Sequence, residues 1–148
     1  SFHLPNRRKN RPMKPNFQLS ARSLSRLDGV HPDLVKVVKR AIQLTDIDFA
    51  VTEGVRSAAR QQQLVAAGAS QTARSRHLPT ANKCGLSCAV DLAAMVGTEV
   101  RWDWPLYPKL AKAMKAAAAE LGVPIEWGGD WKSLVDGPHF QLTWKAYP

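Results

Sequence analysis

Four side chains of this chain could do metal chemistry together: His77, Asp91, Asp136 and His139. Asp91 stands in an apolar stretch, where an unpaired carboxylate would cost on the order of several kcal/mol by desolvation. Asp136 and His139 are three positions apart across a Gly-Pro pair, so both can approach one pocket. Two imidazoles and one carboxylate can supply three protein ligands to Zn²⁺ and leave a fourth position open, as catalytic zinc sites do. Asp136 would then remain free to act as a base.

These spacings alone leave other interpretations open. A histidine beside a strand is commonly a hydrogen-bonded core residue, and a buried aspartate often caps a turn. The charge of Asp91 could instead be compensated by a salt bridge to Arg56 or to Arg76.

Helices with one apolar face and short strands are expected to position these residues. Apolar residues recur at helical spacing over residues 32–44, which predicts a helix with one buried face. Residues 48–56 alternate between apolar and polar side chains, the pattern of a half-buried strand that ends at Arg56. Ser57 suits the N-cap of a second helix, which should end near Ala67.

In the second half of the chain, the sequence predicts a loop, three short strands and one more helix. Residues 69–85 are polar and broken by proline and glycine, which favours a long loop. A strand around Asp91 is expected at 88–94, an alanine-rich helix at 106–121, and two short apolar strands at 125–127 and 139–144. This irregular order of elements predicts an α+β fold with a small, largely antiparallel sheet and flanking helices.

The composition is that of one folded domain. The chain has 148 residues, of which 45% are hydrophobic and 22% charged, and this argues against disorder, collagen-like structure and coiled coil. We find no apolar run near the roughly 20 residues that span a bilayer and no signal-peptide core. The expectation is synthesis in the cytoplasm without a signal peptide.

The charge favours polyanionic partners. Lys and Arg total 21 against 12 Asp and Glu, a formal charge of +9. We expect residues 1–18 to form a basic, proline-containing arm ahead of a single domain at 19–148; the arm is either a solvated tail or an anion-binding segment. Zinc-finger spacing and RNP-like aromatic patterns are both missing from the sequence, so nucleic acid is not the expected partner.

Two cysteines, Cys84 and Cys88, do not have the Cys-x-x-Cys spacing of zinc ribbons or thioredoxin-like sites. Two ordinary thiols, a local structural disulfide and a functional redox pair all remain open.

Four separated motifs lie between about Leu19 and Leu142. They are Glu53-Gly-Val-Arg56-Ser57 with Gln61, Ser75-Arg-His77 leading to Ala89-Val-Asp91-Leu92, Trp127-Gly-Gly-Asp-Trp131, and Asp136-Gly-Pro-His139-Phe-Gln-Leu142. In content and order they resemble the M15 family of zinc peptidases. That family includes phage endolysins that cut between L-alanine and D-glutamate in peptidoglycan, together with D-alanyl-D-alanine dipeptidases and carboxypeptidases.

The resemblance implies a role for each matched residue. One zinc ion per chain would be held by His77, Asp91 and His139, and Asp136 would be the catalytic base. Arg56 would stabilise the developing oxyanion or grip a substrate carboxylate. The residues expected to contact substrate are Arg56, Gln61, Ser75 and Trp131; for Trp131, core packing is the alternative to a substrate wall.

One departure from the family pattern concerns the first two ligands. His77 and Asp91 are fourteen positions apart, whereas the family usually separates them by seven, and Ser87 stands where a glycine is usual. The ligands can still converge if the inserted residues loop out between them.

By this resemblance the chain is a zinc-dependent peptidoglycan hydrolase. The expected reaction is cleavage of the L-alanyl-D-glutamate bond by a phage endolysin that acts on the cell wall in the periplasm, with an anionic outer-membrane surface as a second partner for the arm. A monomer is expected. The alternatives are a D-alanyl-D-alanine exopeptidase and a non-catalytic wall-binding or nucleic-acid-binding domain.

Overall fold

The periodic helices form where the apolar spacing predicts them. The computed structural model describes residues 16–68 and 75–148. Helix α3 (Pro32–Leu44) begins after His31, whose Nδ1 accepts a hydrogen bond from the Asp33 N–H, and it buries one apolar side. Helix α5 (Tyr107–Leu121) ends at Gly122, whose φ of 71° is a left-handed conformation that glycine adopts without strain. Both helices contribute to one hydrophobic core and pack against each other.

Five strands form a single antiparallel sheet in the described part of the chain. The order is β1 (Asp48–Glu53), β2 (Ala89–Val96), β5 (His139–Leu142) and β4 (Ile125–Trp127), with β3 (Glu99–Arg101) pairing to β2. The small antiparallel sheet with flanking helices confirms the predicted fold class.

Strand alternation separates a core face from a polar face. Val90 and Leu92 of β2 and Phe140 and Leu142 of β5 are fully buried in the helix-covered core. Because successive strand side chains point to opposite faces, the residues between them lie on the other face of the sheet. That second face carries Asp91, His139 and Gln141. The sheet therefore supplies the core with one set of positions and the candidate site with the other.

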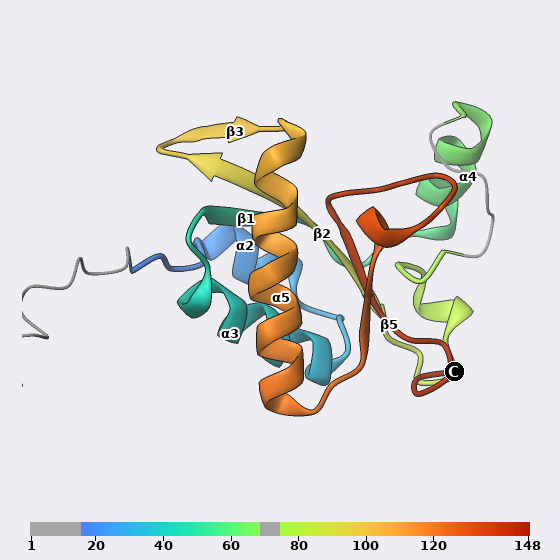
Figure 1. Ribbon diagram of the computed structural model, residues 1–148. Helices are drawn as coiled ribbons and strands as arrows, with labels where there is room; N and C mark the ends of the chain where they lie inside the picture. Colours follow the sequence, from blue (N-terminus) through green and yellow to red (C-terminus); the bar gives the residue numbers. More distant parts are fainter. Residues whose placement is uncertain (1–15, 69–74) are drawn as a thin grey trace, which may run out of the picture.

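Short elements complete the fold around this frame. Helix α4 (Ala58–Ala66) starts at Ser57, whose side chain accepts from the Arg60 N–H, as predicted for an N-cap. Figure 1 shows α4 set apart from α3 and α5. The remaining elements are helix α2 (Ala21–Arg26) and the 3₁₀ turns η1 (Pro79–Ala81), η2 (Trp104–Leu106) and η3 (Gly128–Asp130).

The sequence left helix α2, strand β3 and the three 3₁₀ turns unpredicted, each of which is six residues or shorter. Of the predicted arm at 1–18, only residues 16–18 fall within the described residues, and the first part of the predicted 69–85 loop also lies outside them. Among the helices that the structure describes, none combines the length and the apolar character needed to cross a bilayer.

Candidate metal centre

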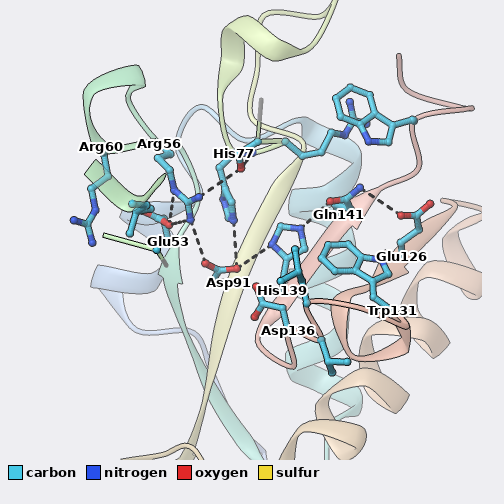
Figure 2. Close-up of a pocket in the computed structure, with 17 residues that line it drawn as sticks. Glu53, Arg56, Arg60, His77, Asp91, Glu126, Trp131, Asp136, His139 and Gln141 are labelled. Carbon is cyan, nitrogen blue, oxygen red and sulfur yellow. Dashed lines mark hydrogen bonds and ion pairs between the residues drawn. The ribbon is translucent and has the colours of Figure 1, made fainter. Parts of the chain in front are cut away.

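The site is assembled by cross-strand pairing on the polar face of the sheet. Asp91 of β2 is the register partner of Glu53 on one side and of His139 on the other. Gln141, two residues after His139, is the partner of Glu126 on β4. Directly opposite side chains in an antiparallel pair lie close enough to interact, so the register brings these five residues together. Figure 2 shows them lining one pocket.

His77 enters from the turn before η1 and is 1% exposed. Its Nδ1 lies 2.8 Å from the carbonyl oxygen of Gly54, which can only accept, so Nδ1 carries the proton and donates. The other ring nitrogen, Nε2, lies 3.3 Å from Oδ1 of Asp91. In the neutral ring, a lone pair therefore faces the carboxylate.

In His139 the two ring nitrogens have exchanged roles: Nδ1 faces Asp91 and Nε2 faces away from it. Its Nε2 lies 2.8 Å from Oε1 of Gln141, and the amide nitrogen of Gln141 donates to Oε2 of Glu126 at 3.4 Å. Because Glu126 takes the amide N–H, the amide oxygen of Gln141 faces His139 and accepts the Nε2 proton. Nδ1 of His139 is left pointing at Oδ1 of Asp91, 3.2 Å away.

The donor set fits a metal ion. One ligand atom from each of His77, Asp91 and His139 lies within 4.8 Å of the other two. Two imidazole lone pairs and an anionic oxygen repel one another unless a positive charge sits among them, and either added protons or a cation can supply it. Each histidine also donates its far N–H to an oxygen, the second contact that orients metal-binding imidazoles in proteins. The three residues expected as ligands are therefore brought together.

Local charges set the protonation of the centre in the metal-free protein. Burial raises the pKa of Asp91, but hydrogen bonds and charge from His139 and His77 outweigh it and hold that pKa far below its usual range. Burial lowers the pKa of His139, but the hydrogen bond and charge of Asp91 reverse this, and the pKa of His139 is raised. Asp91 is thus ionised and His139 holds an extra proton readily when no metal is bound.

Arg56 lies at the end of the pocket beside β1 and is almost buried. Its guanidinium donates from Nε to Oε1 of Glu53 at 2.9 Å, pairs with Glu53 again through Nη2, and lies 3.6 Å from Oδ2 of Asp91. Nη1 donates to Oε1 of Gln61 at 2.8 Å and to Oγ of Ser75 at 3.5 Å. Gln61 and Ser75, predicted to contact substrate, are both found holding this arginine; Ser75 also lines the pocket.

Asp136 is half-buried and lines the same pocket, three residues ahead of His139. Its backbone N–H donates to the Gly128 carbonyl at 3.0 Å, and its carbonyl accepts from the His139 N–H. A side chain at Gly128 would overlap the Asp136 backbone, so this close approach needs glycine. Burial and the charge of Asp91 raise the pKa of Asp136, against the opposing charges of His139, His77 and Arg56. A carboxylate with a raised pKa is suited to accept a proton.

The pocket is an open cleft of about 880 Å³, large enough for a peptide. Trp131, predicted as a substrate wall, lines it with its ring centroid 5.2 Å from that of His139. Leu134 and Val135 are exposed on the same lining, and Arg60 of α4 lines the end near Arg56. The cleft thus combines a polar floor with apolar and basic walls.

The residues between His77 and β2 form a loop with one 3₁₀ turn, η1, and this loop lets His77 and Asp91 converge despite their separation in sequence. Buried Asn82 holds this loop: its side-chain N–H groups donate to the carbonyls of Arg76, Leu78 and Leu86, and its Oδ1 accepts from Nη1 of Arg76 at 2.6 Å. Arg76 also donates to backbone carbonyls of the C-terminal segment. It therefore anchors the loop, while the guanidinium beside Asp91 is that of Arg56, one of the two candidates from the sequence.

The sequence reasoning missed Glu53, Glu126 and Gln141 as members of the site. Gln141 could have been found, since strand alternation places it on the same face as His139. The pairing with Glu126 depends on the register between β4 and β5, for which the sequence holds no direct signal.

Comparisons with known proteins agree on one family. Residues 15–143 match the family of phage L-alanyl-D-glutamate peptidases. The chain is 30% identical over 143 residues to the L-alanyl-D-glutamate peptidase of Escherichia phage T5, an alignment that covers 86% of this chain and 99% of that protein. It is 31% identical over 130 residues to the L-alanyl-D-glutamate peptidase of Listeria phage A118, covering 86% of this chain and 43% of that protein. Among solved structures, the Serratia marcescens L-Ala D-Glu endopeptidase ChiX superposes with a TM-score of 0.80 at 48% identity, covering 88% of this chain and 93% of that one.

Proposed function

Because the chain belongs to the family of phage L-alanyl-D-glutamate peptidases, we propose that it is a zinc-dependent endopeptidase that cleaves the L-alanyl-D-glutamate bond of peptidoglycan stem peptides. The observation that carries this proposal is the convergence of His77, Asp91 and His139 beside Asp136 in a single cleft. Three ligands with a separate carboxylate next to them are the parts that metal-assisted peptide hydrolysis needs.

The donor types favour zinc as the metal. Two imidazoles and one carboxylate, with the rest of the coordination left to small molecules, match the ligand sets of catalytic zinc sites. When bound, zinc supplies Lewis-acid chemistry, which polarises a carbonyl oxygen and makes water more acidic. The protein's part is to hold the ring tautomers, through Gly54 for His77 and Gln141 for His139.

Asp136 is the general base of the proposed mechanism. Its carboxylate takes the proton of the attacking water and later passes it to the amine that leaves, so one residue serves both half-reactions. The raised pKa helps the first transfer, because a more basic carboxylate accepts the proton of water more readily. The close packing of Asp136 on Gly128 holds this segment of backbone in place.

Arg56 supplies positive charge at one end of the cleft. A guanidinium there can stabilise the oxyanion that develops on the scissile carbonyl or bind a substrate carboxylate. Glu53 and Gln61 occupy its other donors and fix its orientation. Gln61 then acts by holding Arg56. Ser75 contacts Arg56 and also lines the cleft, where it can contact substrate. Trp131 forms an apolar wall of the cleft.

Peptidoglycan is the partner of this enzyme, and the cell wall is where it acts. Lysis of a bacterial host at the end of phage growth is the corresponding biological role. The charge of +9 favours approach to an anionic wall or outer-membrane surface, with the basic residues of the arm contributing. A monomer suffices, because every residue of the proposed mechanism comes from one chain.

Metal dependence on purified peptidoglycan tests this proposal. Chelator-treated protein should lose its ability to clear a peptidoglycan suspension, and added zinc should restore it. His77→Ala should lose activity that zinc at the same concentration fails to restore. Full clearing by chelated protein that contains no measurable metal would refute the zinc mechanism.

A further inference from the structure

Two thiols lie side by side in the loop that joins two of the ligand residues. Cys84 is exposed, Cys88 is fully buried, and their Sγ atoms are 3.9 Å apart. Cys88 directly precedes β2, the strand that carries Asp91. Among the described residues that line the cleft, neither cysteine appears, so the proposed hydrolysis leaves this pair without a role.

Contacts with the backbone of Leu86 hold Cys84 close to Cys88. The Leu86 N–H donates to Sγ of Cys84 at 3.4 Å, and the Leu86 carbonyl lies 3.7 Å from Sγ of Cys84 and 3.9 Å from Sγ of Cys88. Asn82 holds that same carbonyl with a hydrogen bond of 2.8 Å. The turn between the cysteines contains Gly85 at φ 73°, a left-handed conformation that suits glycine. A disulfide bond of about 2 Å requires the two sulfurs, now 3.9 Å apart, to move closer within this turn.

Cys88 is the fixed member of the pair. Its N–H donates to the Arg76 carbonyl and its carbonyl accepts from the Leu142 N–H, both at 2.9 Å. These bonds tie Cys88 to the residue before His77 and to the strand of His139. A disulfide between Cys84 and Cys88 would therefore attach the loop to a residue that the backbone hydrogen bonds already hold in place.

We propose that Cys84 and Cys88 are an oxidative modification site that closes an intramolecular disulfide on exposure to a disulfide oxidant such as oxidised glutathione. The Cys84 thiolate attacks one sulfur of the oxidant, forms a mixed disulfide and releases one thiolate. The Cys88 thiolate then attacks Sγ of Cys84, the Sγ–Sγ bond forms and the second oxidant thiolate leaves. Two electrons pass from the protein to the oxidant's disulfide bond, and the two protons lost by the cysteines end on the released thiols.

Exposure fixes the order of these steps. Cys84 reaches solvent and meets the oxidant first, whereas buried Cys88 acts second. Burial raises the pKa of Cys88 to about 11, against the charge of nearby Arg76, and the thiol also interacts electrostatically with Cys84 and Tyr147. Ring closure should accordingly quicken as the pH rises from neutral, since the attacking species is the thiolate. The disulfide concerns a loop outside the cleft, so this inference is independent of the proposed hydrolysis.

Mass spectrometry of the full-length protein after treatment with oxidised glutathione tests the proposal. The wild type should lose two hydrogen masses, lose both free thiols and retain no glutathione. Cys88→Ser should instead keep one glutathione on Cys84, and Cys84→Ser should react far more slowly through its buried thiol. Wild type that keeps glutathione on Cys84, keeps two free thiols or forms disulfide-linked dimers would overturn the proposal.

Thermal unfolding gives a second readout that does not depend on activity. Oxidised wild type should unfold at a higher temperature than the reduced form, because a bridge restricts the unfolded chain. Cys84→Ser has only an exposed side chain altered, and its unfolding should not respond to the oxidant. An equal response of wild type and Cys84→Ser would mean that the effect comes from somewhere other than this bridge.

Discussion

Nε2 of His139 lies 2.8 Å from Oε1 of Gln141, and this contact decides which nitrogen of the ring faces the candidate metal centre. Gln141 can accept the Nε2 proton because Glu126 binds the N–H side of its amide. The lone pair on Nδ1 is thereby directed at the centre that His139 shares with Asp91. A residue outside the proposed ligand set thus sets the tautomer of a proposed ligand.

Replacing Gln141 should therefore weaken metal binding. Gln141→Leu removes the acceptor, and we expect zinc affinity to fall by about 10-fold or more, as loss of such an outer contact commonly does. Gln141→Glu combined with Glu126→Gln keeps an acceptor oxygen for His139 and an amide beside a carboxylate, with the two groups exchanged, and should retain affinity within a few-fold. Competition with a zinc-binding dye measures both variants. Equal losses in the two would show that the position serves packing and not the tautomer.

Substitutions of Asp136 and His139 should have different effects, because Asp136 is the proposed base and His139 a proposed zinc ligand. Asp136→Asn keeps the size of the side chain but cannot take up the proton of water, so turnover should fall by roughly 10²-fold or more while zinc content is retained. His139→Ala removes a ligand, so both zinc content and thermal stability should drop. Metal analysis and melting curves of the two variants make the comparison. An Asp136→Asn protein that loses zinc as readily as His139→Ala would make Asp136 a ligand.

The pH dependence of metal-free stability follows from the shifted pKa values of Asp91 and His139. The pKa of Asp91 is lowered in the fold, so its stabilisation is present above its unfolded value near 4 and is lost as the pH falls below it. The pKa of His139 is raised, so its stabilisation is present below its unfolded value near 6.5 and is lost as the pH rises through the folded value. Metal-free protein should be most stable between about pH 4 and 6.5.

Zinc should remove the loss of stability on the alkaline side, because the metal takes over the charge that the His139 proton supplied. Denaturation midpoints of chelated and zinc-loaded protein, measured across the pH range, give the comparison. Chelated protein whose stability keeps rising from neutral to alkaline pH would contradict the role assigned to the His139–Asp91 pair.

The N-terminal arm should matter for intact cells and not for soluble substrate. Its basic residues favour anionic surfaces, so deleting residues 1–15 should leave hydrolysis of soluble peptidoglycan fragments nearly unchanged. Lysis of intact cells should weaken, most strongly at low salt, where electrostatic attraction reaches furthest. Equal loss on both substrates would show that these residues belong to the catalytic domain.

The longer helices and the convergence of the three candidate ligand residues could be predicted because their signals are local. The periodic apolar residues of 32–44 give the bounds of α3 as observed, and Ser57 and Gly122 mark the start of α4 and the end of α5. His77, Asp91 and His139 stand in short motifs that can be read one at a time, and the fold brings them together.

What escaped prediction depends on long-range contacts. Helix α2 is six residues long, too short for a periodic signal, and it lies against β1. Arg76 links the loop that follows His77 to Leu142, a residue of a segment that is distant in sequence. The link from Gln141 to Glu126 requires the strand register. In each case the determining interaction exists only after the chain has folded.

The bond that is cleaved tests the central claim most directly. Purified peptidoglycan digested with zinc-loaded protein, followed by mass spectrometry of the released fragments, should give stem peptides with a new N-terminal D-glutamate and glycan strands that retain L-alanine. Asp136→Asn protein with the same zinc content should release roughly 10²-fold less of these fragments. Release of free D-alanine or D-alanyl-D-alanine alone, with the L-alanyl-D-glutamate bond intact, would contradict the assignment and select an exopeptidase.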